Sequence, residues 1–143
     1  TIMKTLFAFA VSTVILSACY GAPPNEKILT GLCQDIFAGD DQIVRMLASD
    51  ASTDLDGFCT CYGATIAADA VKLPLHKDVV MAIAEARKSA GGGAEDAAEK
   101  VEEMIQSGEI DTFTEDQLDS TGDDFQRISE AMHDNGGVCP ATT

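Results

Sequence analysis

The fold is decided by residues 54–72, DLDGFCTCYGATIAADAVK, which have the spacing of a helix that is apolar on two sides. One side carries Leu55, Cys59, Tyr62, Ile66 and Ala70, and the other carries Phe58, Cys61, Thr65 and Ala68. A helix with two apolar sides must be covered on both. We therefore predict that this segment is the central helix of the domain and that Pro74 ends it.

The rest of the chain has helical spacing as well, and no stretch alternates with the two-residue period of a strand. The spacing predicts a first helix after Asn25 that stops at Gly39 and a short helix capped by Asp40. It also predicts helices from Pro74 to the glycines at 91–93, over 94–106, and from a capping box at Thr114–Gln117. Gly122 would mark a kink in the last one. We expect an all-α domain of about five to six helices, stapled by two disulfides.

The N-terminus has the features of a secretory signal. Lys4 precedes the apolar run Leu6 to Leu16, and small residues follow it. This run would form about 16 Å of helix, whereas a bilayer core of roughly 30 Å needs about twenty residues. We therefore predict that residues 1–18 are a signal peptide rather than a membrane span.

Residues 16–19, Leu-Ser-Ala-Cys, resemble the lipobox of bacterial lipoproteins at all four positions. This resemblance implies lipidation at Cys19 and attachment to the membrane through acyl chains on that residue. Because Tyr20 rather than Asp follows, it implies the periplasmic face of the outer membrane. Residues 19–24 would be a tether, kept from forming helix by its two prolines, and residues 25–143 the helical domain. The alternative is cleavage after Ala18 without lipid, which would give a secreted, unanchored effector.

The charge of the chain limits its partners. Without Lys4, the mature chain would carry eight cations against 24 acids, a net charge of −16, and the cations do not cluster. Such a chain repels phosphate backbones, so nucleic acid is excluded as a partner. A basic protein partner in the envelope is the expectation that this charge supports.

Four cysteines remain beside Cys19, and an even number in an exported chain indicates two disulfides. Residues two apart on a helix point about 200° away from each other, so Cys59 and Cys61 cannot bridge. We favour Cys33 with Cys59 and Cys61 with Cys139, because Cys33 and Cys59 lie on the more apolar faces of their helices. Exchange of the two partners, Cys33 with Cys61, stays open.

The combination of a lipobox, one cysteine on a first helix, Phe58-Cys59-Thr60-Cys61-Tyr62 and a last cysteine near the C-terminus resembles small helical envelope lipoproteins of Gram-negative bacteria. This resemblance spans most of the chain. It implies a location in the cell envelope and the disulfide framework, and it implies no activity.

Two alternative hypotheses assign a redox or a metal-binding role to Cys59 and Cys61. Cys59 and Cys61 could form a thiol-redox pair, although the spacing is shorter than Cys-x-x-Cys and no strand precedes it. They could also bind a soft metal together with His76 or His133. We expect both histidines at the surface instead, and we predict no metal site.

Acidic clusters offer weak binding signals. Asp50, Asp54, Asp56 and Gly57 suggest a calcium loop, but the position that needs a bidentate Glu is Gly63. The group Asp111, Glu115, Asp116, Asp119, Asp123 and Asp124 reads as a solvated acidic face that could meet a basic partner.

The sequence contains no nucleophile elbow, no phosphate-binding glycine loop after a strand and no H-E-x-x-H. We therefore predict no catalytic residues and no cofactor. The favoured function is a lipid-anchored envelope protein whose helical domain is structural or binds a partner, through a helical groove or the acidic face.

Overall fold

The computed structural model describes residues 24–141. Within that range it contains six α-helices, one π-helical turn and no strand, so the predicted all-α fold class is confirmed. The predicted signal peptide, Cys19 and most of the tether lie outside the described residues. No helix between residues 24 and 141 has both the length and the apolar character that crossing a bilayer requires.

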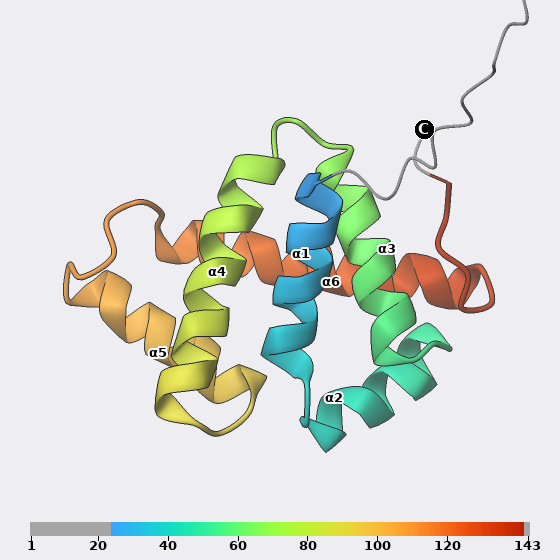
Figure 1. Ribbon diagram of the computed structural model, residues 1–143, viewed down its shortest axis with the longest axis horizontal. Coiled ribbons are helices and arrows are strands. Elements are labelled where there is room, and N and C mark those ends of the chain that lie inside the picture. Colours follow the sequence, from blue (N-terminus) through green and yellow to red (C-terminus); the bar gives the residue numbers. More distant parts are fainter. Residues whose placement is uncertain (1–23, 142–143) are drawn as a thin grey trace, which may run out of the picture.

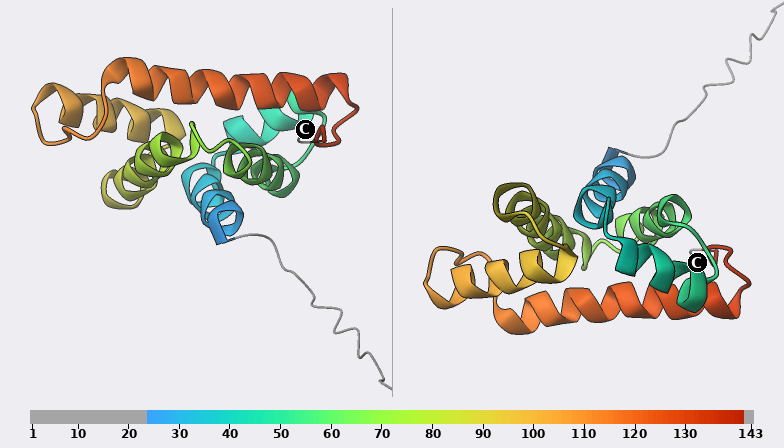
Figure 2. Two further views of the ribbon diagram at one scale, coloured as in Figure 1. Left: turned by 90° about the horizontal axis from the view of Figure 1, so that it is seen from above. Right: turned by 90° about the horizontal axis from the view of Figure 1, so that it is seen from below.

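Three helices lie side by side as one layer: α4 (Leu73–Ala90), α1 (Pro24–Phe37) and α3 (Leu55–Ala67) (Figure 1). The helix α6 (Glu115–Asp134) crosses one face of this layer. Two shorter helices, α5 (Ala94–Gln106) and α2 (Asp41–Met46), lie on the same side of the layer as α6 and near its opposite ends (Figure 2). The π-helical turn Leu47–Ala51 continues α2. The result is a three-helix layer with α6, α5 and α2 arranged over one of its faces.

Local polar contacts begin several of these helices where the sequence predicts. The Asp40 side chain accepts a hydrogen bond from the Ile43 amide at the start of α2. Its second oxygen accepts one from the Ala94 amide at 3.1 Å, so one carboxylate caps the starts of both α2 and α5. Thr114 and Gln117 form the reciprocal capping box of α6.

Three boundaries differ from the prediction. The helix α3 ends at Ala67 rather than Lys72, because the Asp69 carboxylate accepts the amides of Val71 and Lys72 and forms a turn there. Pro74 does not end a helix; it lies in the first turn of α4, where a missing N–H costs nothing. Pro24 likewise begins α1 instead of belonging to a non-helical tether.

Two further features depart from the expected helix pattern. Gly122 does not interrupt α6, which is one continuous helix of 20 residues. The π-helical turn after α2 was not predicted, and it buries Leu47 and Ala51 before Ser52 turns the chain in the left-handed conformation, with φ at 55°.

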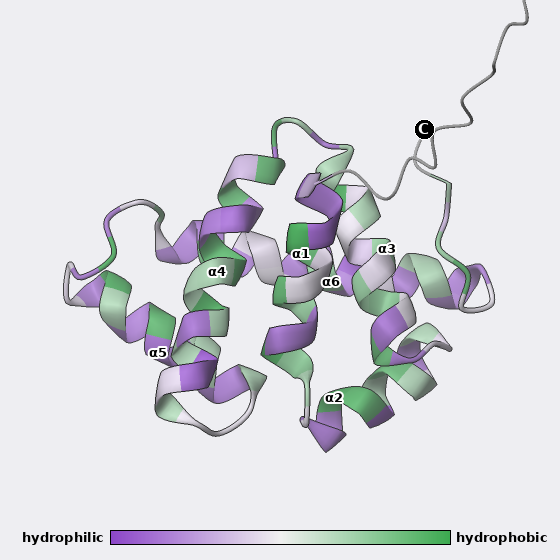
Figure 3. Ribbon diagram, in the orientation of Figure 1, coloured by the Kyte–Doolittle hydropathy of each residue, from purple (hydrophilic) through white to green (hydrophobic). Residues whose placement is uncertain are grey.

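The core lies between the three-helix layer and the helices α2, α5 and α6 that cover it, and α3 contributes both of its sides to this core. Both predicted apolar sides of α3 are covered: Cys59 and Tyr62 are fully buried, and Phe58 and Cys61 nearly so. Figure 3 shows the contrast, since α3 has few strongly hydrophilic positions whereas α4 and α5 alternate between the two kinds of residue. The predicted burial of both apolar sides is confirmed, whereas the middle helix of the layer is α1, with α3 beside it (Figure 1).

Candidate functional site

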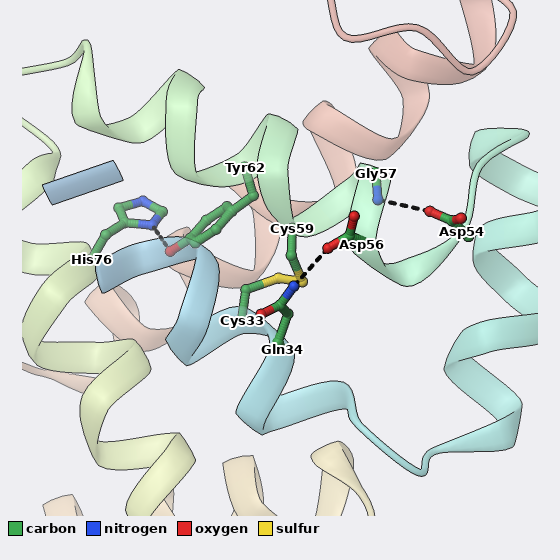
Figure 4. The surroundings of a disulfide bond; sticks show 8 residues. All are labelled: Cys33, Gln34, Asp54, Asp56, Gly57, Cys59, Tyr62 and His76. Atoms are coloured by element: carbon green, nitrogen blue, oxygen red, sulfur yellow. Dashed lines mark hydrogen bonds between the residues drawn. A yellow bond between two sulfur atoms is a disulfide. The ribbon is translucent and has the colours of Figure 1, made fainter. Parts of the chain in front are cut away.

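Both disulfides connect to α3, and they follow the pairing that the sequence favours. Cys33 of α1 bonds Cys59, and Cys61 bonds Cys139 of the C-terminal segment, with Cα–Cα distances of 5.5 and 5.3 Å. Figure 4 shows the first of these bonds between its two helices. While both bonds are intact, neither Cys59 nor Cys61 is a thiolate, so redox exchange or metal binding at this pair would require reduction first.

The acids around residue 54 have local structural contacts. The Asp54 carboxylate accepts the Gly57 amide at 2.7 Å and caps α3, and Asp56 accepts the side-chain amide of Gln34 at 2.8 Å (Figure 4). Asp50 accepts the Ser49 hydroxyl. Between residues 24 and 141, no group of three or more His, Cys, Asp or Glu side chains is arranged to hold a metal ion.

A buried hydrogen-bond network joins α3, α4 and α6. The Tyr62 hydroxyl lies 2.9 Å from Nδ1 of His76, and Nε2 of His76 lies 2.9 Å from the Asp124 carboxylate. The exposed fraction is 0 % for Tyr62, 1 % for His76 and 5 % for Asp124. The prediction that His76 lies at the surface is therefore wrong, whereas His133 is exposed as expected. Asp124 is likewise no part of a solvated face.

The protonation states in this network follow from burial and hydrogen bonding. Burial lowers the pKa of His76 and outweighs the Asp124 hydrogen bond, which acts in the opposite direction. Burial alone would raise the pKa of Asp124, but hydrogen bonds from Lys72 and His76 leave it below its ordinary value. Neutral His76 therefore donates from Nε2 to an ionised Asp124 and accepts the Tyr62 hydroxyl at Nδ1. Burial also raises the pKa of Tyr62, which keeps its proton.

Two cations complete the pairing of Asp124. Nζ of Lys72 and a guanidinium nitrogen of Arg127 each lie 2.7 Å from the same carboxylate oxygen. Both cations reach the surface beside a groove of about 660 Å³ between the end of α3, α6 and the C-terminal segment. Because the carboxylate already engages both, this groove presents no unpaired cation from the network.

A larger groove of about 1180 Å³ lies on the side of the molecule that carries α2, α5 and α6. Its floor contains three aromatic rings, Phe37, Phe58 and Phe125, which contact one another at centroid distances of 5.5 to 6.4 Å. We call these three rings the aromatic floor. Leu118, Ile43 and Met46 extend the apolar lining, and Met46 is 42 % exposed. Phe58 is buried, whereas Phe37, Phe125 and Met46 leave part of their apolar surface open to solvent.

The buried network supports the floor of this groove. The Tyr62 ring stacks on the Phe125 ring with centroids 4.2 Å apart and planes 12° from parallel. Tyr62 is held in turn by His76 and Asp124. The orientation of Phe125 is thus fixed from below before anything enters the groove.

Carboxylates surround the groove. Its lining includes seven acids and, among the described residues, no Lys, Arg or His; we call the seven the acidic rim, namely Asp50, Glu95, Glu99, Glu102, Asp119, Asp123 and Glu130. Glu95, Glu99 and Glu102 share one side of α5, and Asp119, Asp123 and Glu130 share one side of α6, since spacings of three, four and seven fall on the same face of a helix. Two acidic stripes therefore flank the apolar floor.

Only part of the predicted acidic face belongs to this groove. Asp119 and Asp123 line it, whereas Asp111, Glu115 and Asp116 do not, and Asp124 is buried and lines the smaller groove instead. The acids of α5 were not predicted to belong to a site, although their spacing at 95, 99 and 102 was the signal that could have revealed them. No local signal marked the buried contact of Asp124 with His76, which lies 48 residues away on α4, although Arg127, another partner, is only three residues along α6.

No protein-family model, no curated protein and no solved structure matches the chain.

Proposed function

We propose that this chain is a lipid-anchored protein of the bacterial cell envelope whose helical domain binds a basic partner protein without catalysing a reaction. The observation that carries the proposal is the groove, in which seven carboxylates and no cation of the described chain surround an apolar floor. The groove leaves the partly exposed rings of Phe37 and Phe125 and the side chain of Met46 in contact with water, and the like charges around them repel one another. A cationic apolar partner would relieve both costs.

The cellular location in this proposal is inferred from residues outside the described range. The Leu16-Ser17-Ala18-Cys19 motif supports acylation of Cys19, and Tyr20 supports outer-membrane sorting in a Gram-negative host. Because the chain is strongly acidic, anionic lipid headgroups would not attract the domain, and attachment would depend on the acyl chains.

The inaccessibility of the polar network supports a non-catalytic role. Tyr62, His76 and Asp124 are the described groups with the most evident acid–base arrangement, yet the Tyr62 and His76 side chains have almost no contact with solvent. A general acid or base must come within hydrogen-bond distance of its substrate. The contacts of this network instead hold three helices together.

The experiment compares the wild type with two variants that lose three charges each. The rim variant carries Glu99→Gln, Glu102→Gln and Asp123→Asn. The control variant carries Asp78→Asn, Glu85→Gln and Glu109→Gln, all exposed positions outside the groove. Each protein is used as bait for envelope proteins of the host, at low salt and at about 0.5 M salt, where screening is strong.

We expect the wild type and the control variant to capture the same basic protein at low salt, and the rim variant to lose it. Capture should fail for all three proteins at high salt. A partner held equally by the rim variant, or held without regard to salt, would contradict the proposal. Intact mass spectrometry of the same wild-type preparation tests the anchor, because acylation adds its mass at Cys19.

A further inference from the structure

We infer that the groove binds a single amphipathic helix with an apolar face toward the aromatic floor and Lys or Arg along both flanks. This inference rests on the proposed function and specifies the partner at the same site. It follows from three properties of the groove: the chemistry of its walls, the placement of its charges and its size.

The walls of the groove determine the backbone conformation of the occupant. Helices α5, α6 and α2 supply the walls, and there is no strand within residues 24–141 that could add a partner strand. Helices use their own backbone groups internally, so an extended segment lying in this groove would leave its amides and carbonyls without partners. A helical segment satisfies its own backbone and presents only side chains.

The acidic rim determines the charge pattern of the occupant. The stripe on α5 runs from Glu95 to Glu102 and the stripe on α6 from Asp119 to Glu130, which are seven and eleven helical steps, or about 10 and 16 Å. Because the stripes flank the aromatic floor, cations are needed on both edges of an apolar face. Lys or Arg at spacings of three and four residues on either side of an apolar stripe meets this requirement.

The volume of the groove matches the part of a bound helix that would lie inside it. One turn of a helix about 10 Å across occupies roughly 420 Å³, so a groove of about 1180 Å³ accommodates the inner half of several turns. The partly exposed rings of Phe37 and Phe125 and the side chains of Leu118 and Met46 are the surfaces that an apolar anchor would cover.

A second copy of this chain does not have the required charge. Most of the cations in the described range already have partners: Lys72 and Arg127 contact Asp124, Lys88 contacts Asp35, Lys100 contacts Glu103, and Arg87 donates to backbone carbonyls. Residues 1–23 carry a single cation, Lys4. Both partners of a homodimer through this groove would present the same acidic rim.

The test uses synthetic peptides of about 18 residues that contain Leu, Lys and one Trp. The first peptide places Leu on one helical face with Lys on both flanks. The second has the same composition in an order that gives no apolar face, and the third has the first order with Glu in place of Lys. Because the chain contains no tryptophan, the Trp fluorescence of each peptide reports binding without interference.

We expect the first peptide to bind the wild type and the control variant equally, and to bind the rim variant about tenfold more weakly, as the loss of three exposed charge pairs predicts. The second and third peptides should bind at least tenfold more weakly than the first. Leu118→Gln, at a partly buried groove position, should weaken the first peptide while leaving the circular dichroism spectrum unchanged.

The other outcomes separate the two proposals. If the first two peptides bind equally and the rim variant weakens both, a basic partner stands but the helical form of the occupant is wrong. If no cationic peptide binds, or if the rim and control variants weaken binding equally, the groove is not the binding site and the proposed function also fails. A wild-type dimer that the first peptide dissociates would show that the natural occupant is a second copy, contrary to our inference.

Discussion

Asp123 and Asp124 are neighbours on α6 and have opposite surroundings. Asp124 is buried and its carboxylate engages His76, Lys72 and Arg127. Asp123 is exposed on the groove side, where the acidic rim contains no cation. One side of α6 thus holds the domain together with fully paired charges, and the other leaves charges unpaired. The paired side serves stability, and in the function that we propose the groove side binds the partner at a cost in stability.

The largest expected effect is the loss of stability on removing the Cys61–Cys139 disulfide, which tests whether the side of α6 with paired charges also depends on this bond. Cys61, next to Tyr62, is bonded to Cys139 across a separation of 78 residues. Replacing both with Ala should lower the free energy of unfolding by roughly 4.5 kcal/mol, because the unfolded chain regains the entropy of that loop. Urea denaturation monitored by circular dichroism measures this. A loss below about 1 kcal/mol would show that the network alone fixes α3 against α6.

The next largest effect is on the free energy of unfolding when Asp124 or Asp123 is replaced with Ala. Asp124→Ala should destabilise the domain by about 3 kcal/mol, because the Nε2 donor of His76 is left buried without an acceptor. The value lies at the low end for a buried ion pair, since Lys72 and Arg127 remain partly solvated. Asp123→Ala should change stability by less than about 0.5 kcal/mol. Equal effects at the two positions would remove the distinction between the sides of α6.

A smaller effect concerns the pH dependence of the paired side. Because burial lowers the pKa of His76 below its ordinary value of 6.5, the unfolded chain takes up a proton that the native state resists. The stabilisation is present above about pH 6.5 and declines on acidification below it, with a slope of at most about 1.4 kcal/mol per pH unit.

The variant His76→Gln should lose this slope, and His133→Gln should keep it, because His133 is exposed and lies outside the network. Denaturation curves collected between about pH 7.5 and 5.5 measure the difference. A slope that survives in His76→Gln would assign it to another group.

The smallest effect has the opposite sign and belongs to the groove side. The rim variant should be more stable than the wild type by about 0.5 to 1 kcal/mol at low salt, because it removes several like-charge contacts along α5 and α6. The gain should disappear at about 1 M salt. Thermal unfolding of the rim and control variants measures it. An equal gain in both would indicate a general effect of net charge rather than a property of the groove.

Features set by local spacing were predictable from the sequence. The range of α5 and the capping box of α6 depend on neighbouring residues, and both are confirmed. The disulfide pairing was also accessible, because the rotation between Cys59 and Cys61 excludes one of three arrangements and apolar burial favours another.

Features set by contacts distant in sequence were not predictable. His76 and Asp124 are 48 residues apart, and no local pattern shows that they meet. The groove needs α5, α6 and α2 brought together over the ends of α1 and α3, so the acids of α6 were interpreted as a solvated face and those of α5 were not predicted to bind anything. The early end of α3 was missed for another reason: the Asp69 side chain takes backbone amides that a continuing helix would have used.

The arrangement of the cysteines has a consequence for biosynthesis. Cys33 is synthesised 26 residues before Cys59, and Cys139 follows 78 residues after Cys61. During that interval Cys33 has two candidate partners that differ by about 200° of rotation around α3. Bonding to Cys61 would turn the wrong side of α3 toward α1 and move Tyr62 away from His76. An oxidant that acts before the chain is complete would therefore trap this error, and an enzyme that rearranges disulfides would be needed to correct it.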